Sequence, residues 1–280
     1  MKPVAVLAAL LLGACAPAPA RQAVTTASAG AGGPTIVSLN PCTDAILAEV
    51  ADPDQLLALS HYSRDPASSS MDIALARRFR ATSGAVEEVL ALRPDVVVAG
   101  TFLPPATRQA FARLGIRLVQ VPIAGDLAAS KAQVTSLAAL AGNPERGRAL
   151  NARIEAALAQ AAPPPGTPLA AVVWQSGGIV AGDDTLIADL LRHTGFINAA
   201  AARGLSQADY LPLERMVADP PQVILAAGSS RADEDRLLAH PALAGLDATR
   251  RASFDPSLLW CGGPTIPRAV ARLAEVRRAR

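Results

Sequence analysis

The chain has 280 residues, of which 51% are hydrophobic, 18% are charged and only 3% are aromatic, and its formal net charge is +2. That length suits one large or two medium-sized domains, and the apolar content is ample for a core. A net charge this small gives no electrostatic footprint for nucleic-acid binding, so we expect no nucleic-acid partner.

Residues 1–14 have the pattern of an export signal rather than of a membrane anchor. One lysine precedes an apolar run that is too short to span the roughly 30 Å hydrocarbon core of a bilayer. The run ends in Leu-Gly-Ala-Cys, which resembles a bacterial lipobox and predicts lipidation of Cys15. Cleavage at an Ala-x-Ala site, after Ala18 or Ala20, is the alternative. In both cases we expect a periplasmic protein, and in the first it is lipid-anchored.

Residues 15–34 are small, polar and rich in Pro and Gly, so they predict a flexible tether. Ordered sequence begins with "TIVSLN", a buried strand, followed by the helix "NPCTDAILAEVAD" with Asn40 as its N-cap and Pro41 at its first position. Strands and helices then alternate through residues 35–125. This alternation predicts a parallel sheet covered on both faces.

Residues 126–162 change to helix without strand. The first helix stops at Gly142-Asn143, and a second begins at Pro144 and ends before a run of prolines. The α/β alternation resumes in residues 163–280, with a helix expected around 232–244 and a last one from about 265. The sequence therefore predicts an N-terminal lobe, a helical connector and a C-terminal lobe.

The helix–proline–strand segment "VEEVLALRPDVVVAG", residues 86–100, is repeated as "LERMVADPPQVILAA", residues 213–227. Without gaps, Glu87 aligns with Glu214 and Pro94 with Pro221. Such corners also recur by chance in α/β proteins. If the repeat is genuine, the two lobes are similar α/β units and each carries a glutamate at the same place.

Four segments, "IVSLNPCTDAILAEV", "EEVLALRPDVVVAG", "GDDTLIADLLRHTGFINAAA" and "LERMVADPPQVIL", resemble in order and spacing the periplasmic solute-binding proteins of ABC importers for ferric siderophores and cobalamin. The resemblance runs from about Thr35 to the C-terminus. It implies an α/β fold of two Rossmann-like lobes linked by a single long backbone helix, with the ligand in the cleft between them.

The resemblance also implies a role for the repeated glutamates. In this family one exposed glutamate on each lobe docks onto arginines of the membrane permease, and these would be Glu87 and Glu214. The alternative is that both are ordinary solvated helix residues. The implied partners are a permease with its ATPase and a small-molecule chelate, and we expect the binding protein to be a monomer.

Ligands of open α/β sheets bind outside the carboxyl ends of the strands. Several of the scarce aromatic residues fall there, and a bulky chelate needs flat apolar walls with few polar groups. Arg64 could meet carboxylate or phenolate oxygens. We expect the ligand-binding residues to be Cys42, Tyr62, Arg64, Phe102, Trp174 and Trp260.

Three roles are open for Cys42 and Cys261, which are expected at the cleft rim on opposite lobes. They could form a disulfide in an oxidising compartment, hold a soft metal together with His61, or serve as small wall residues. The wall role is the one we expect, without a metal site.

The sequence shows none of the common catalytic motifs, and Asp183-Asp184 is expected to cap the helix "TLIADLL" rather than to act as an acid–base pair. We therefore expect a binding protein without a cofactor, with a ferric siderophore as first ligand and cobalamin as second. The alternatives are a bilobal α/β enzyme that uses the cleft, which turnover of the ligand would reveal, and a heme-binding or metal-sensing surface lipoprotein without a transporter.

Overall fold

The computed structural model describes residues 33–163, 165–228 and 240–279. The expected signal segment, Cys15 and nearly all of the tether lie outside these ranges, as does most of the helix expected around 232–244. Within the described ranges, no helix combines the length and the apolar character needed to cross a membrane.

The N-terminal lobe is built on a parallel sheet with the strand order β3-β2-β1-β4-β5. Apolar strands such as "VVV" in β4 are buried on both faces, as is typical of parallel sheets. The strands are β1 (Ile36–Ser38), β2 (Leu56–Ser60), β3 (Ala81–Thr82), β4 (Val96–Gly100) and β5 (Leu118–Val121), and the helices are α1 (Pro41–Val50), α2 (Ile73–Ala76), α3 (Val86–Leu92) and α4 (Pro105–Arg113).

The start of α1 follows the sequence prediction. Asn40 is the N-cap, and its side-chain oxygen accepts hydrogen bonds from the backbone N–H groups of Cys42 (2.9 Å) and Thr43 (3.4 Å). Pro41 takes the first helical position, where its missing N–H leaves no bond unmade. The cap therefore fixes Cys42 directly beyond the carboxyl end of β1.

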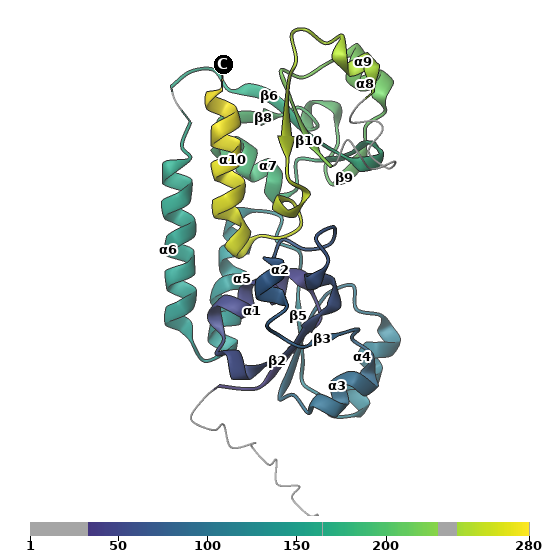
Figure 1. Cartoon of the computed structure of the whole chain (residues 1–280), viewed down its shortest axis with the longest axis vertical. Coiled ribbons are helices and arrows are strands. Elements are labelled where there is room, and N and C mark those ends of the chain that lie inside the picture. The colour runs from purple at the N-terminus through teal and green to yellow at the C-terminus, as the bar shows by residue number, and fades with distance from the viewer. Residues whose placement is uncertain (1–32, 164, 229–239, 280) are drawn as a thin grey trace, which may run out of the picture.

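Two helices connect the lobes: α5 (Leu127–Leu140) and α6 (Pro144–Gln160). The break between them is the predicted one, at Gly142-Asn143. The 17 residues of α6 rise about 26 Å at 1.5 Å per residue. Figure 1 shows α6 running along one side of both lobes, where it contacts α1 and α5 in one direction and α10 in the other.

The C-terminal lobe is built on a second sheet with the order β11-β10-β6-β7-β9, and β8 also pairs with β6. Its strands are β6 (Leu169–Gln175), β7 (Ile179–Ala181), β8 (Phe196–Asn198), β9 (Ala208–Tyr210), β10 (Val223–Ala227) and β11 (Arg250–Phe254), and its helices are α7 (Leu186–His193), α8 (Leu213–Ala218), α9 (Pro241–Ala244) and α10 (Ile266–Arg278).

This sheet departs from the expected all-parallel alternation because β7 is antiparallel to both β6 and β9. The sequence reading missed β3, β7, β8 and β9. Each has only two or three residues, which is too few for a hydrophobic period to be visible. The short hairpin formed by β6 and β7 extends the sheet at the edge that β9 completes.

The repeated segments occupy equivalent places in the two lobes. In the first lobe, α3 leads into β4, which lies between β1 and β5; in the second, α8 leads into β10, which lies between β6 and β11. In both cases the strand is flanked by the first and last strands of its lobe that belong to the parallel set. The repeat is therefore structural and not a chance similarity of sequence.

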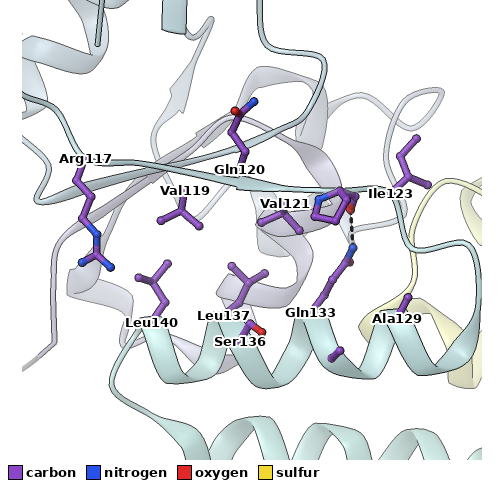
Figure 2. A pocket seen from close by; sticks show the side chains of 12 residues that line it. Arg117, Val119, Gln120, Val121, Ile123, Ala129, Gln133, Ser136, Leu137 and Leu140 are labelled. Atoms are coloured by element: carbon purple, nitrogen blue, oxygen red, sulfur yellow. Dashed lines mark hydrogen bonds between the residues drawn. The ribbon is translucent and has the colours of Figure 1, made fainter. Parts of the chain in front are cut away.

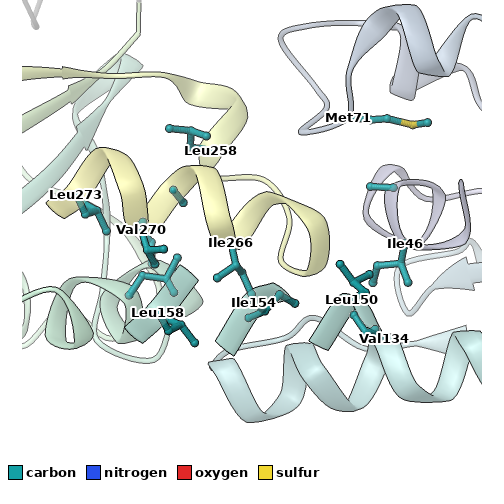
Figure 3. Close-up of a cluster of buried hydrophobic side chains, with 14 of the residues drawn as sticks. Ile46, Met71, Val134, Leu150, Ile154, Leu158, Leu258, Ile266, Val270 and Leu273 are labelled. Atoms are coloured by element: carbon teal, nitrogen blue, oxygen red, sulfur yellow. The ribbon is translucent and has the colours of Figure 1, made fainter. Parts of the chain in front are cut away.

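The buried apolar residues that the structure describes form three clusters, and the one with the most residues runs through both lobes along the connector. Figure 3 shows it as a row of side chains that begins at Ile46 and Met71 of the N-terminal lobe and passes along α6 through Leu150, Ile154 and Leu158 to α10. The buried face of α10 contributes Ile266, Val270 and Leu273 to the same row. The connector is thus packed into the core rather than lying on its surface.

Candidate ligand-binding site

The carboxyl ends of the two sheets face each other, and a disulfide demonstrates this directly. Cys42 follows β1, Cys261 follows β11, and the two are bonded with their Cα atoms 5.0 Å apart, within the usual range of roughly 4.4–6.8 Å. Of the roles left open for the two cysteines, the disulfide is the correct one, and contact of Cys42 with a ligand stays a prediction. A soft-metal site that uses these two sulfurs is excluded, because a disulfide offers no thiolate.

The N-terminal lobe presents exposed apolar side chains just beyond its strand ends. Tyr62 follows β2 and is 52% exposed, Phe102 follows β4 and is 82% exposed, and Ile123 follows β5 and is 74% exposed. Single exposed apolar residues are common, but a group of them is typical of a binding surface, and these three all follow strands at the same edge of the sheet. The structure thus places Tyr62 and Phe102 where the sequence predicted them and adds Ile123.

A buried network holds the turn that carries Tyr62. The carboxylate of Asp44, in the first turn of α1, is fully buried, and its Oδ2 accepts hydrogen bonds from the Ser60 N–H (2.9 Å) and the Ser63 hydroxyl (2.6 Å). The Ser60 hydroxyl accepts from the Tyr62 N–H at 3.3 Å. Burial raises the pKa of Asp44 to about 8, although these hydrogen bonds act in the opposite direction.

The two basic residues of this turn are only partly available to a ligand. Arg64 is exposed, but one of its guanidinium nitrogens donates to the carbonyl of Phe79. The ring of His61 lies 4.0 Å from that of Tyr62, centroid to centroid, and His61 Nδ1 lies 3.2 Å from the Thr82 carbonyl. Arg64 can still offer its remaining N–H groups to an anionic substituent.

The C-terminal lobe contributes Trp260 and Tyr210 to the facing side. Trp260, in the connection between β11 and α10, is 45% exposed, and Tyr210, at the carboxyl end of β9, is 57% exposed. Tyr210 was not among the predicted site residues, because β9 has only three residues and no sequence pattern marked Tyr210 as lying at a strand end. The scarcity of aromatic residues, with two tyrosines in the chain, is the signal that could have found it.

Trp174 is a correction. Its side chain is 0% exposed and packs with Val172, Val180 and Met216 on the outer side of the second sheet. Residues alternate between the two faces of a strand, so Trp174, which lies inside β6 rather than past its end, shares the face of Val172. It is a core residue in this structure and not part of the ligand-binding surface.

Asp183 and Asp184 also differ from their expected role. The N-cap of α7 is Thr185, whose hydroxyl accepts from the Ala188 N–H at 3.4 Å. Asp183 instead pairs with Arg192 at 2.8 Å. Neither carboxylate caps the helix, because Thr185 is one residue closer to its first turn.

Glu87 and Glu214 each occupy the second position of an equivalent helix, α3 and α8, and both are exposed. Neither makes an ion pair or a hydrogen bond with another residue that the structure describes. The neighbouring Glu88 differs: it accepts from the Thr82 hydroxyl (2.7 Å) and the Ser83 N–H (2.8 Å), and the Thr82 bond is the main reason that its pKa is lowered. Glu87, not Glu88, therefore projects freely from this lobe.

A hollow of about 590 Å³ lies between β5 and α5, along the length of the strand. Figure 2 shows Val119 and Val121 of the strand opposite Leu137 and Leu140 of the helix, with Gln133 donating to the Pro122 carbonyl at 2.5 Å. The lining residues fall between Arg117 and Leu140, so the C-terminal lobe contributes nothing to it. The groove shares Ile123 with the surface between the lobes, and its other lining residues lie on or next to β5, on α5 and in the connection between them.

Within the described ranges, no group of three or more His, Cys, Asp or Glu side chains could hold a metal ion. The facing surfaces offer instead aromatic and aliphatic groups, two phenols and one arginine. This set is suited to enclosing a large, flat, mostly apolar molecule rather than to binding a bare ion.

The fold, two α/β lobes whose strand ends face each other beside a helical connector, is that of a bilobal solute-binding protein. A family model described as "periplasmic binding protein" matches residues 36–253, and the chain belongs to this family. This confirms the family that the sequence resembles. No match was found among the curated proteins.

Three solved structures illustrate the likeness. The periplasmic heme-binding protein RhuT from Roseiflexus sp. RS-1 is 24% identical with a TM-score of 0.65, covering 88% of this chain and 97% of that one. A periplasmic heme-binding protein from Pseudomonas aeruginosa is 25% identical with a TM-score of 0.67, covering 88% and 94%. The vitamin B12-binding protein BtuF of Vibrio cholerae is 19% identical with a TM-score of 0.67, covering 88% and 98%.

Proposed function

We propose that this chain is the substrate-binding component of an ABC importer and that its cargo is a planar metallotetrapyrrole, with heme as the first candidate. The cargo binds between the lobes and leaves chemically unchanged. The observation that carries the proposal is a pair of exposed tyrosines on opposite lobes, Tyr62 and Tyr210, accompanied by the apolar side chains of Phe102 and Trp260.

The chemistry of iron favours heme over the other two ligand classes. A phenolate oxygen is a hard donor, and tyrosine is one of the residues that hold heme iron in proteins. A ferric siderophore wraps its own iron in oxygen donors and needs no such ligand. Heme leaves two axial positions open, one on each face of the ring, and the two tyrosines stand on opposite sides of the proposed site. The apolar neighbours suit the ring, and Arg64 suits a propionate.

The known ligands of similar structures support this order. Those from Roseiflexus and Pseudomonas are heme-binding proteins, and the one from Vibrio cholerae binds vitamin B12. The sequence alone ranked a ferric siderophore first and cobalamin second. No residue of this site specifically favours a siderophore or cobalamin. The two exposed phenol groups, in contrast, could ligate the iron of heme.

Hemin titration should show saturable binding and a phenolate-to-iron charge-transfer absorption. Tyr62→Phe and Tyr210→Phe remove one hydroxyl each and keep the ring. Loss of one axial phenolate should weaken binding at least ~10-fold, the effect of about 1.4 kcal/mol. The double variant Tyr62→Phe/Tyr210→Phe should lose the charge-transfer band altogether.

Cobalamin and a ferric siderophore, titrated against the same variants, are the controls, because neither needs a protein phenol. Hemin spectra that stay the same in the double variant would rule out tyrosine ligation. Binding of the siderophore in preference to hemin would overturn the ligand assignment and restore the order that the sequence suggested.

We propose that Glu87 and Glu214 dock the loaded protein onto a permease, one charge on each lobe. Exposed ion pairs contribute about 0–1 kcal/mol each, so the pair would orient the complex rather than hold it. Their equivalent positions on α3 and α8 would register the space between the lobes over the entrance of the transporter.

The double variant Glu87→Ala/Glu214→Ala should bind hemin as the parent does but support little uptake. Glu145→Ala/Glu275→Ala is a matched control, since it removes the same charge from two exposed glutamates that lie on α6 and α10. Uptake assays in cells that carry the transporter compare the two. Equal uptake by both double variants would refute the docking role.

We also propose export to the periplasm and lipidation at Cys15. The family supports the compartment, and the Leu-Gly-Ala-Cys sequence supports the anchor. The mass of the mature N-terminal peptide distinguishes a lipidated Cys15 from simple cleavage after Ala18 or Ala20.

A further inference from the structure

The antiparallel pair of β7 and β9 carries Tyr210 at the edge of the second sheet. Its register places Tyr210 directly opposite Ile179, and the N–H of Leu211 donates to the carbonyl of Gly178 at 2.9 Å. β9 lies on the side of the C-terminal lobe that is turned toward the N-terminal lobe (Figure 1). The backbone of Tyr210 is therefore fixed by strand pairing on the side that faces the proposed cargo.

The two faces of this strand pair differ in burial. Val180 and Leu211 belong to the apolar cluster around Trp174 and are at most 1% exposed. Ile179 and Tyr210 occupy the opposite face, since side chains alternate along a strand, and they are 37% and 57% exposed. Because the buried face anchors both strands, the position of the phenol group depends on how the Tyr210 ring is held on the open face.

The Tyr210 ring lies against the bare backbone of Gly178, the buried last residue of the turn that precedes β7. A Cβ atom on Gly178 would lie 2.8 Å from the ring carbon Cε2 and 3.3 Å from Cδ2. Two carbon atoms in contact are normally separated by roughly 3.5–4.0 Å. The ring thus occupies space that any side chain at position 178 would need, and it could not keep this place beside one.

Gly177 offers a comparison within the same turn. Both glycines have a positive φ, +69° for Gly177 and +84° for Gly178, which residues with a side chain rarely adopt. A Cβ atom on Gly177, however, would meet no atom of the described residues within 4 Å. Replacement of either glycine by alanine strains the backbone, but only at position 178 does the new methyl group contact the Tyr210 ring.

We propose that Gly178 is a positioning residue for the cargo: the space left by its missing side chain sets where the Tyr210 phenol group stands opposite Tyr62. Gly178 acts through the ring that it supports, in the way that residues behind a metal ligand orient that ligand. The placement of the ring rests on the contacts above alone, whereas its value for binding rests on the proposed function.

The first measurement needs no ligand. Tyr62 and Tyr210 are the two tyrosines of the chain, so in Tyr62→Phe an isotope-labelled tyrosine gives the NMR signals of the Tyr210 ring alone. In this background the ring protons should show nuclear Overhauser effects to the Hα protons of Gly178. Gly178→Ala should move the ring signals, whereas Gly177→Ala, the matched control, should leave them in place.

The second measurement uses hemin and keeps both tyrosines. Gly178→Ala should weaken binding about 10-fold, as the loss of support behind a metal ligand does, and shift the charge-transfer band, while Gly177→Ala should bind as the parent does. In the Tyr210→Phe background no phenol group is left to displace, so Gly178→Ala should have little further effect. Urea denaturation of both glycine variants checks that the backbone strain they share does not account for the difference.

The two measurements separate the contact from its role in binding. Absence of the Overhauser effects in Tyr62→Phe would overturn the contact itself, even if Gly178→Ala does not fold. Equal shifts of the ring signals in the two glycine variants would refute control by position 178. A displaced ring with unchanged hemin binding would show that Gly178 does not position the cargo. If hemin fails to bind the parent while the ring is displaced as expected, the proposed cargo fails and the placement of Tyr210 by Gly178 stands.

Discussion

Removal of the Cys42–Cys261 disulfide is expected to lower the free energy of unfolding by about 2–5 kcal/mol. The bond joins residues 219 positions apart, and the entropy that a cross-link removes from the unfolded chain grows with the length of the closed loop. The chain-entropy model gives about 5 kcal/mol for a loop of this length. Residual structure in the unfolded state would lower that figure.

Urea denaturation of Cys42→Ala/Cys261→Ala measures the effect, and the parent under reducing conditions repeats it without a mutation. Reducing agent should leave the double variant unchanged, which separates loss of the bond from any general effect of the agent. Equal denaturation midpoints for the parent in its oxidised and reduced forms would contradict the expectation. Because one apolar cluster extends through both lobes, we expect a single transition in all samples.

The order of lobes and connector could be predicted because it depends on long, regular patterns. Runs such as "VVV" in β4 and "VIL" in β10 have the length and branching of buried strands, and Asn40-Pro41 and Gly142-Asn143 mark helix ends by known capping chemistry. The repeat of Glu87 at Glu214 then identified equivalent corners, and the sheet order places them equivalently.

The site was less predictable because it depends on the direction and pairing of single residues. Trp174 was placed at the end of a strand, yet it lies inside β6, and the alternation of faces turns it into the core. Tyr210 was missed because β9 is three residues long and gains its strand geometry from pairing with β7. Pairing partners that are distant in sequence leave no local pattern.

The cysteines illustrate the same limit. Sequence placed Cys42 and Cys261 on opposite sides of the site but left a disulfide, a metal and an inert role open. The choice depends on whether two Cα atoms come within roughly 7 Å, and this is set by the packing of segment 260–268 on Ser70 and Ser130. The contacts of these two serine hydroxyl groups join residues that are far apart in the sequence, so residue spacing cannot predict them.

Replacement of Asp44 by asparagine is expected to stabilise the protein at neutral pH. The pKa of Asp44 is raised from 3.8 to about 8 because the carboxyl group is buried. Between these two values the unfolded chain has lost this proton while the folded chain retains it. The contribution of this carboxyl group to the free energy of unfolding is therefore at its maximum below pH 4. It decreases as the pH rises toward 8 and no longer changes above pH 8. Relative to its value below pH 4, the free energy of unfolding at pH 7 is lower by about 4 kcal/mol, because each pH unit between the two pKa values costs 1.36 kcal/mol.

The Asp44→Asn variant would keep an acceptor oxygen for the Ser60 N–H, but its side chain would carry no titrating proton. The gap in unfolding free energy between Asp44→Asn and the parent should thus widen steadily from pH 4 to pH 8, as measured by urea denaturation at several pH values. Asp65→Asn is the control: a hydrogen bond from Ser68 lowers the pKa of Asp65, so its stabilising effect is lost toward acid and the trend has the opposite sign.

Parallel stability curves for Asp44→Asn and the parent would show that Asp44 does not titrate with a raised pKa. If the curves diverge as expected, Asp44 destabilises the fold at neutral pH, and what it contributes must come from its hydrogen bonds. Those bonds, to Ser60 and Ser63, flank Tyr62. Asp44→Leu, which removes the oxygen that accepts both bonds, should therefore weaken hemin binding more than Asp44→Asn does, even though neither variant can titrate at this position.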